Sequence, residues 1–193
     1  GYYFYDVNAK LAHTLSNRDK LFASYYMGDD QVYTHIKFKD QDATTKMDLG
    51  WNWGNIVGSL RWNHVFSPRL FVNTTLNYTQ YRHKLDIGGS DEYSGQYDVD
   101  FKLAYHSLIN DISAAADFEY NPSPAHDIRF GATYIRHAFK PAITTVRFGD
   151  NSATAGQAAI DTTFGDKNLF TGEAAAYVED RSEEHTSELQ SRS

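Results

Sequence analysis

The sequence of 193 residues contains no cysteine and only four prolines. Without cysteine, a disulfide framework and a cysteine-ligated metal centre are both excluded. No run of about 18 apolar residues occurs, which excludes a transmembrane helix. A net charge of −7 argues against a nucleic-acid partner. Phosphate-binding glycine loops and the HExxH and GxSxG motifs are also missing, so we expect no catalytic residue and no enzyme.

Aromatic residues, by contrast, are abundant. They make up 15% of the chain, with 14 tyrosines and 12 phenylalanines, although the mean hydropathy of −0.58 is that of a polar sequence. Membrane-spanning β-strands combine these properties, because only one face of each strand is apolar and aromatic residues gather at its ends.

The clearest pattern lies between Met47 and Leu85, where two alternating arms flank the turn 67–69. In the first arm, one face carries Ile56, Gly58, Leu60 and Trp62, and the other carries Asn55, Ser59, Arg61 and Asn63. In the second arm, one face carries Leu70, Val72, Thr74, Leu76 and Tyr78, and the other carries Asn73, Thr75, Asn77 and Thr79. Each arm is long enough for the roughly 9–11 tilted residues that cross a membrane. The segment therefore predicts a transmembrane β-hairpin.

The alternation changes phase near Gly54. Trp51 and Trp53 have odd numbers, whereas the apolar positions from Ile56 to Trp62 have even numbers. A β-bulge at Gly54 and Asn55 would absorb the extra residue. Alternatively, the tryptophan pair lies beyond the lipid, where alternation is not enforced.

Connections along the chain alternate between short and long. Further strands are predicted at Tyr3–Leu15, from Leu21, at Ile109–Tyr120, at Asp127–Phe139 and at Asn168–Glu179. The short turns are 16–19, 67–69 and 121–126, and the long polar connections are 28–46, 86–106 and 140–167. Within them VYTHIKF at 32–38 still alternates, so that the hairpin can continue as a ribbon above the membrane, and YDVDFKLAYHS at 97–107 is also strand-like. Outer-membrane barrels have short periplasmic turns and long extracellular loops. We therefore expect an all-β fold: an antiparallel up-and-down meander of about seven strands of an incomplete transmembrane β-barrel.

Both ends of the sequence have an unusual character. Gly1 begins inside a strand-like pattern, without an initiator methionine or a signal peptide. The run RSEEHTSELQS at 181–191 resembles the in-frame translation of a short-read sequencing adapter. We expect residues 1–180 to be a partial barrel without its plug, and residues 181–193 to be a non-native tail, disordered or irregular.

Four runs carry a resemblance to a known family. These are YDVNAKLAHTLSNRDKLFASYY, GNIVGSLRWNHVFSPRLFVNTTLNYTQYR, DFEYNPSPAHDIRFGATYIRHAFKP and GEAAAYVED. They resemble the barrel of TonB-dependent receptors of the Gram-negative outer membrane. The resemblance implies a barrel of about 22 strands closed by a plug. It further implies uptake of a scarce ligand (a siderophore, glycan, cobalamin or peptide) with energy passed on by the TonB complex, in contact with outer-membrane lipid.

Other classes of protein remain open. The same alternation suits a passive porin-type barrel without TonB coupling. An outer-membrane hydrolase would need a serine and histidine pair, which adjacent strands do not offer. A soluble β-sandwich would cover its apolar faces with each other, so Leu60, Leu76 and Phe118 would lie beneath a second layer.

Candidate ligand contacts come from the predicted long connections or lie near them. They are Asp29, Asp30, Tyr33, His35, His83, Tyr93, Tyr97 and His106. Tyrosines can stack on a sugar or another ring, and Asp29 and Asp30 would offer oxygens to Ca²⁺ beside Asp40 and Asp42. We favour a solvated acidic loop for the aspartates and ordinary loop packing for the tyrosines. We therefore predict neither a metal site nor a cofactor. The carboxylates Asp111, Asp117 and Glu119 share a face that we expect to line a water-filled interior.

Overall fold

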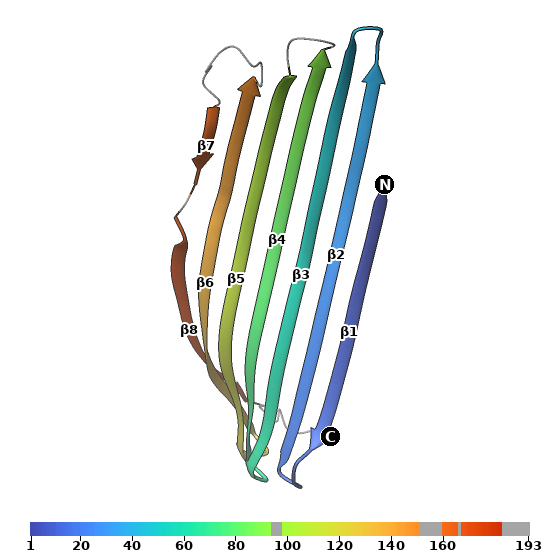
Figure 1. Cartoon of the computed structure of the whole chain (residues 1–193). Helices are drawn as coiled ribbons and strands as arrows, with labels where there is room; N and C mark the ends of the chain where they lie inside the picture. The colour runs from blue at the N-terminus through green and yellow to red at the C-terminus, as the bar shows by residue number, and fades with distance from the viewer. Residues whose placement is uncertain (94–97, 151–159, 166, 183–193) are drawn as a thin grey trace, which may run out of the picture.

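Eight β-strands form one antiparallel sheet in the computed structural model, which describes residues 1–93, 98–150, 160–165 and 167–182 (Figure 1). The strands are β1 Tyr2–Thr14, β2 Asp19–Lys39, β3 Ala43–Ser67, β4 Leu70–Tyr93, β5 Asp98–Ser123, β6 His126–Asp150, β7 Ile160–Phe164 and β8 Leu169–Ser182. No helix in this part of the chain is long and apolar enough to cross a membrane.

The strands lie side by side in the order of the sequence. At the end of the sheet, β7 pairs with residues 144–148 of β6 and β8 pairs with residues 126–139, so β7 and β8 share the last position. Among the described residues β1 pairs only with β2, and the sheet is therefore open. The predicted all-β meander, with seven strand positions of an incomplete barrel, is confirmed.

The strands are much longer than the sequence pattern suggested. The four from β3 to β6 contain 24 to 26 residues each. Most described residues of 28–46 and 86–106 continue β2 to β5, with a short turn at 40–42, so the long polar loops expected there are wrong. The strand-like ribbons expected at 32–38 and 97–107 are confirmed for their described residues. Most of the described part of 140–167 likewise belongs to β6 and β7. Backbone hydrogen bonds pair these segments with their neighbours, and apolar residues such as Val32, Ile36 and Phe38 still recur at alternate positions within them.

The register defines two faces that run across the whole sheet. Leu60, Leu76 and Ala114 lie opposite one another on β3, β4 and β5, and we call their side the Leu76 face. Ser59, Asn77 and Ser113 make up the matching row on the other side, the Asn77 face. Pairing between β2, β3 and β4 continues without a shift through Gly54 and Asn55. The proposed bulge at that point is therefore wrong.

The sheet is a single layer without a core. Among the described residues, only two hydrophobic side chains are buried, those of Val72 and Ala104. Leu60 and Leu76 are 41% and 50% exposed, and Phe118 is half-buried within its own sheet. No second layer of the described chain covers them, which excludes the sandwich arrangement within this segment.

The first residues of the expected tail do not leave the sheet. Arg181 and Ser182 continue β8 and pair with Asp127 and His126. An irregular structure beginning at Arg181 is therefore wrong for these two residues. The rest of the tail, 183–193, lies outside the described residues.

Candidate functional site

An apolar band occupies the Leu76 face in the half of the sheet that contains the short turns, the lower half in Figure 1. The band is built from Leu21, Ala23, Tyr25, Met27, Ile56, Gly58, Leu60, Trp62, Val72, Thr74, Leu76, Tyr78, Ile112, Ala114, Ala116, Phe118, Phe130, Ala132 and Tyr134. Period-two alternation places small polar side chains such as Ser59, Asn77 and Ser113 directly behind it. Near its upper edge the same face also carries Gln80, Asn110 and Arg136. The band is thus predominantly apolar, and on one side of the sheet only.

Carboxylate and imidazole pairs mark the lower boundary of the band. Asp19 Oδ1 lies 2.6 Å from His64 Nδ1 and also accepts a 3.0 Å hydrogen bond from the indole of Trp62. His126 Nδ1 lies 3.0 Å from Asp180 Oδ2. Both histidines lie close to short turns, and their carboxylate partners lie on neighbouring strands, which the sequence pattern does not reveal.

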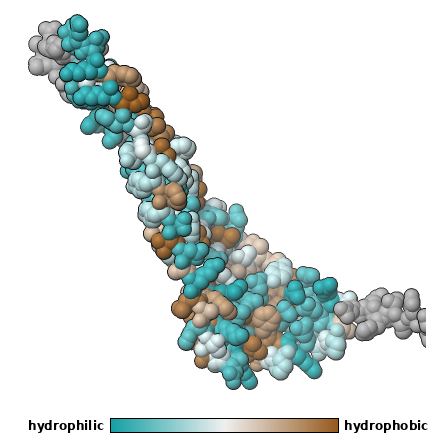
Figure 2. Space-filling model, turned by 90° about the vertical axis from the view of Figure 1, so that its right-hand side faces the viewer, coloured by the Kyte–Doolittle hydropathy of each residue, from teal (hydrophilic) through white to brown (hydrophobic). Residues whose placement is uncertain are grey.

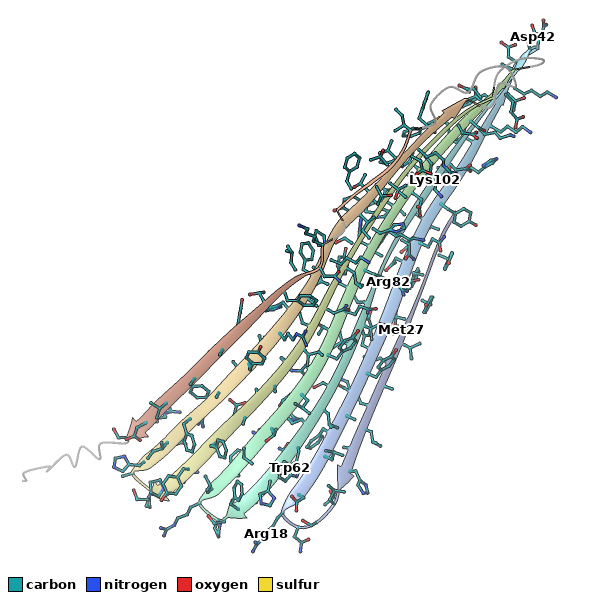
Figure 3. The ribbon with its side chains drawn as sticks, turned by 60° about the vertical axis from the view of Figure 1, so that its left-hand side comes forward. Arg18, Met27, Asp42, Trp62, Arg82 and Lys102 are labelled. Carbon is teal, nitrogen blue, oxygen red and sulfur yellow. The ribbon has the colours of Figure 1, made fainter. Side chains whose placement is uncertain are left out.

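An ion pair marks the upper boundary. Arg82 Nη2 of β4 lies 3.0 Å from Asp29 Oδ1 of β2, and Asn52 donates a 3.1 Å hydrogen bond to Asp29 Oδ2. Asp29 is only 8% exposed. Figure 3 shows Arg82 midway along the sheet, between Trp62 near the lower end and Lys102 near the upper end. A buried carboxylate needs such partners, because an unpaired one loses its hydration without compensation.

Gly54 makes this ion pair possible. The pair joins β2 to β4 across β3, and Gly54 is the β3 residue directly opposite both partners. A Cβ atom at Gly54 would lie 2.5 Å from Asp29 Oδ1 and 3.0 Å from the backbone oxygen of Gly28. Any other residue would therefore push the two charged groups apart.

On the Asn77 face, a hydrogen bond also joins two strands across the strand between them. The hydroxyl of Tyr177 on β8 donates a 2.9 Å hydrogen bond to Asp117 Oδ1 on β5, across Gly131 of β6. A Cβ at Gly131 would lie 2.9 Å from that carboxylate oxygen and 2.8 Å from the tyrosine ring. In both places a glycine lets two strands that are not neighbours exchange a polar contact.

The two boundaries set the height of the band. Asp19 pairs with His64 in the register, and Asp29 pairs with Gly54, so the band measures 11 residues on β2 and 11 on β3, boundary residues included. This matches the roughly 9–11 residues with which a tilted strand crosses a bilayer.

Above the upper boundary the two faces exchange their character. The Leu76 face becomes charged, with His35, Lys37, Lys46, Asp48, Lys84, Asp86, Glu92, Lys102 and Arg147. The Asn77 face becomes apolar, with Val32, Ile36, Phe38, Leu49, Trp51, Leu85, Ile87, Phe101, Leu103, Val146 and Phe148. In the edge-on view of Figure 2, hydrophobic residues gather along one side of the narrow upper part. The phase change at Gly54 is thus an exchange of polarity in a continuous strand, and Trp51 and Trp53 lie beyond the band.

Cross-strand ion pairs stabilise the charged upper part of the Leu76 face. His35 pairs with Asp48, and Lys46 pairs with Glu92. The hydrogen bond from the Lys46 ammonium holds the pKa of Glu92 below its ordinary value. On the opposite face, the Tyr2 hydroxyl donates a 2.8 Å hydrogen bond to Asp30, which raises the pKa of the phenol because its anion would face a carboxylate.

The candidate ligand contacts are divided between the two faces. Asp29, Tyr33, His35 and His106 lie on the Leu76 face, and Asp30 and His83 lie on the Asn77 face. All six residues lie on strands. The loop placement is therefore wrong for the five within 28–46 and 86–106, because these segments pair as extensions of the hairpins, whereas His83 was expected only near a long connection. Tyr97 and the side chain of Tyr93 lie outside the described residues. The structure does not bring the six together, and their contact with a ligand stays a prediction.

On the Asn77 face, His83 belongs to an aromatic cluster that the sequence did not predict. Its Nε2 accepts a 2.7 Å hydrogen bond from the indole of Trp51, whose ring centre lies 4.8 Å from that of Trp53. The ring of Tyr105 meets His83 edge-on at 5.7 Å.

The aspartates proposed for Ca²⁺ do not converge. Asp29 and Asp30 point to opposite faces, and the turn with Asp40 and Asp42 lies ten residues further along β2, about 30 Å away. In the described part of the chain no group of three acidic or histidine side chains could hold a metal ion.

The carboxylate row of β5 lies on the Asn77 face, and each member has a partner on another strand, β6 for Asp111 and Glu119 and β8 for Asp117. Asp111 lies 2.8 Å from His137, Asp117 accepts the bond from Tyr177, and Glu119 lies 3.7 Å from Arg129. These contacts join strands rather than assembling a pair of catalytic carboxylates.

Comparison with known proteins identifies no family for this chain. No family model matches the chain, and no curated protein matches it. Among solved structures, the chain is similar to OmpT (in-vitro folded), an outer membrane protein of Vibrio cholerae, with 11% sequence identity and a TM-score of 0.16. The match covers 89% of this chain and 64% of that one, less than two thirds of its length. At so low a score, the fold rests on strand order and register: an open, antiparallel all-β meander.

Proposed function

We propose that this chain is part of the wall of an outer-membrane β-barrel, and that the barrel is a TonB-dependent receptor that takes up a scarce ligand. The observation that carries the proposal is the 11-residue band on the Leu76 face, uncovered by any described part of the chain and backed by a polar face. A barrel wall in a bilayer needs this division, with apolar side chains toward lipid and polar ones toward a water-filled interior.

Many apolar side chains of the band are exposed. Apolar surface left in water costs about 25 cal/mol per Å², and an exposed patch beyond a few hundred Å² indicates an interaction surface. Leu76, Ile112 and Tyr134 are each at least half exposed, and they lie on the same face of the consecutive strands β4, β5 and β6, in adjacent rows. Hydrocarbon would cover this surface without any further protein layer.

The direction across the membrane follows from the two ends of the sheet. The lower end has the short turns that outer-membrane barrels place in the periplasm. The upper half extends beyond the band, with strands about twice as long as a membrane requires. This half would stand outside the cell, where the apolar part of the Asn77 face and the cluster around His83 would face the entrance for a small-molecule or oligomeric ligand.

Cysteine labelling tests the membrane orientation, since the chain has no cysteine of its own. Single cysteines at Leu60, Leu76 and Ile112 should resist a hydrophilic maleimide in intact outer membranes, because hydrocarbon covers them. Cysteines at the neighbouring Ser59, Asn77 and Ser113 should react, and all six should react after denaturation. Equal labelling of the two sets in intact membranes would refute the membrane-spanning band.

Uptake measurements separate a TonB-dependent receptor from a passive porin. The family resemblance supports the receptor, which draws energy from the inner membrane. Dissipating the proton-motive force should therefore abolish accumulation of its ligand while leaving binding at the cell surface intact. Accumulation that continues at an unchanged rate would identify a passive barrel instead.

A further inference from the structure

A hollow on the Leu76 face lies directly at the upper boundary of the band. It has a volume of about 270 Å³ and is lined by Arg82, Lys84, His106, Lys140, Leu108 and Ile143 among others. It lies beside a register shift between β5 and β6, where Leu108 pairs with Lys140 but His106 pairs with Ile143. The extra residue in β6 is a β-bulge, a feature that redirects side chains at the edge of a site.

The hollow has an excess of positive charge. Arg82 is paired with Asp29 at 3.0 Å, and Lys84 only approaches Asp86 at 4.0 Å. Lys140 has no ion-pair partner among the described residues. Arg136 adds a fourth cation two rows below Lys140, with its guanidinium 5.4 Å from the centre of the Phe170 ring.

The lower boundary of the same face has the opposite character. On the strands there, the charged groups are the Asp19–His64 and Asp180–His126 pairs, without a lysine or arginine among the described strand residues. Arg18 and Arg69 stand in the turns below. The lipid-facing side is thus basic at its upper edge and acidic or neutral at its lower edge. This asymmetry fits a membrane whose upper leaflet has the anionic headgroups.

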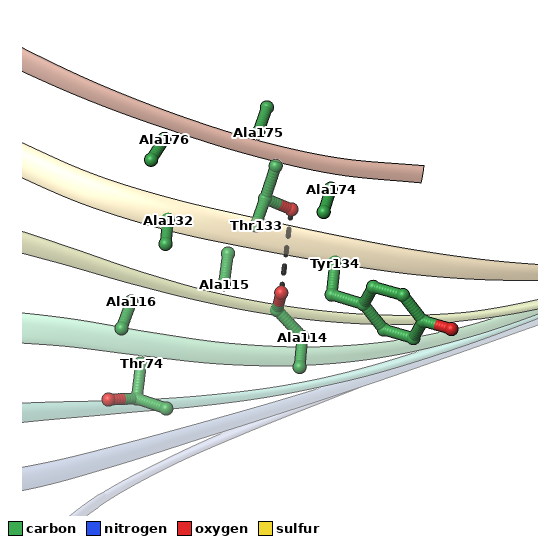
Figure 4. A pocket seen from close by; sticks show the side chains of 10 residues that line it. All are labelled: Thr74, Ala114, Ala115, Ala116, Ala132, Thr133, Tyr134, Ala174, Ala175 and Ala176. Carbon is green, nitrogen blue, oxygen red and sulfur yellow. Dashed lines mark hydrogen bonds between the residues drawn. The ribbon is translucent and has the colours of Figure 1, made fainter. Parts of the chain in front are cut away.

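An apolar groove lies on the band below the hollow. Ala114, Ala116, Ala132, Tyr134, Ala174 and Ala176 contribute side chains to its lining, and Figure 4 shows them pointing to the same side. Because alanine leaves space between the larger Tyr134 and Phe130, the surface is hollowed here. Leu108 and Ala114 are six residues apart on β5, about 20 Å, a distance that an extended acyl chain spans.

We propose that this hollow binds the phosphate-bearing headgroup of an outer-leaflet lipid, with one acyl chain lying along the alanine groove. The proposal rests on the membrane orientation of the proposed function. Arg82, Lys84 and Lys140 would donate hydrogen bonds to the phosphate oxygens, and charge-assisted bonds of this type are the strong ones. Leu108 and Ile143 would contact the glycerol or sugar end of the acyl chains. A free phosphate offers the same oxygens but nothing for the apolar residues.

Spin-labelled lipids test the site. The protein is purified from outer membranes and reconstituted into phosphatidylcholine vesicles with a trace of spin-labelled phosphatidic acid or spin-labelled phosphatidylcholine. We expect the protein to immobilise a larger fraction of the spin-labelled phosphatidic acid than of the spin-labelled phosphatidylcholine. The Lys84→Gln/Lys140→Gln variant should lose at least about fivefold of this preference, the effect of roughly one charge near a headgroup. The matched control Lys10→Gln/Lys20→Gln removes two charges from the Asn77 face and should keep the preference.

Three outcomes would overturn the proposal. The wild-type protein could show no preference for phosphatidic acid, or the control variant could lose as much preference as the double variant of the hollow. Inorganic phosphate could also displace the labelled phosphatidic acid and bind equally well in detergent, which would identify a site for free anions. Protection of a cysteine at Leu76 reports separately on the membrane orientation, so a protein that spans the membrane without selecting phosphatidic acid refutes this inference alone.

Discussion

Replacing Leu76 with arginine is expected to destabilise the folded protein in a bilayer by about 2–4 kcal/mol, the cost of a cation near the middle of a lipid-facing strand. Leu76 lies at mid-height of the band, six residues below Arg82 on the same strand, and half of its surface is exposed. In the proposed orientation hydrocarbon would surround the guanidinium, which could reach neither boundary without distorting the strand.

The adjacent residue supplies the control. Asn77→Arg introduces the same side chain on the opposite face, between Ser59 and Ser113, where we expect water. Its cost should stay at about 1 kcal/mol, the net value of the 3.2 Å hydrogen bond from Asn77 to Ser113 that it removes. Guanidinium unfolding in lipid vesicles, followed by tryptophan fluorescence, measures both variants. If both were destabilised equally, or if Leu76→Arg were neutral, the Leu76 face would not face lipid.

The sequence predicted the lower half of the sheet well because two requirements coincide there. A strand with lipid on one side and water on the other needs alternating residues, and alternation also reveals which residues share a face. The alternation therefore predicted correctly which residues share a face with Leu60 and which share a face with Leu76, and the register places both faces on the same side of the sheet. The short turns could be recognised for the same reason, since polar residues interrupt the alternation there.

The upper half was misjudged because both faces changed character at once. At Gly54 the apolar positions move from even to odd numbers without any change in the backbone register. Sequence patterns record only the alternation, so a phase change indicates either a bulge or an exchange of polarity. Above Gly54, the apolar residues of β3 from Trp53 to Met47 have odd numbers. Because the register with β2 and β4 is unbroken there, the phase change is an exchange of polarity between the two faces.

Contacts between strands that are distant in sequence could not be predicted at all. Asp29 and Arg82 are separated by 52 intervening residues, and nothing in either local segment indicates its partner. The glycine between them offered a signal, since an isolated glycine in a strand often marks a close approach of other groups. Gly131 offered the same signal for Tyr177 and Asp117.

Arg82→Met is expected to reduce the free energy of unfolding by about 3 kcal/mol, the lower end of the range for breaking a buried ion pair. The substitution removes the cation from Asp29, which is 8% exposed and would keep only its bond from Asn52. The lower end applies because the Arg82 side chain is itself 43% exposed. Unfolding in lipid vesicles measures the loss.

The double variant Asp29→Asn/Arg82→Met should recover most of this stability, because a neutral amide costs far less than an unpaired carboxylate when both are buried. Gly54→Val provides an independent test of the geometry, since its side chain would occupy the space between Asp29 and Arg82. It should destabilise by about 1–3 kcal/mol, the usual cost of overpacking. Gly58→Val, on the same strand and face but with nothing within 4 Å of its Cβ, should cause no loss. If the double variant were as unstable as Arg82→Met, or if both glycine variants behaved alike, the ion pair would not be what holds β2, β3 and β4 together at the edge of the band.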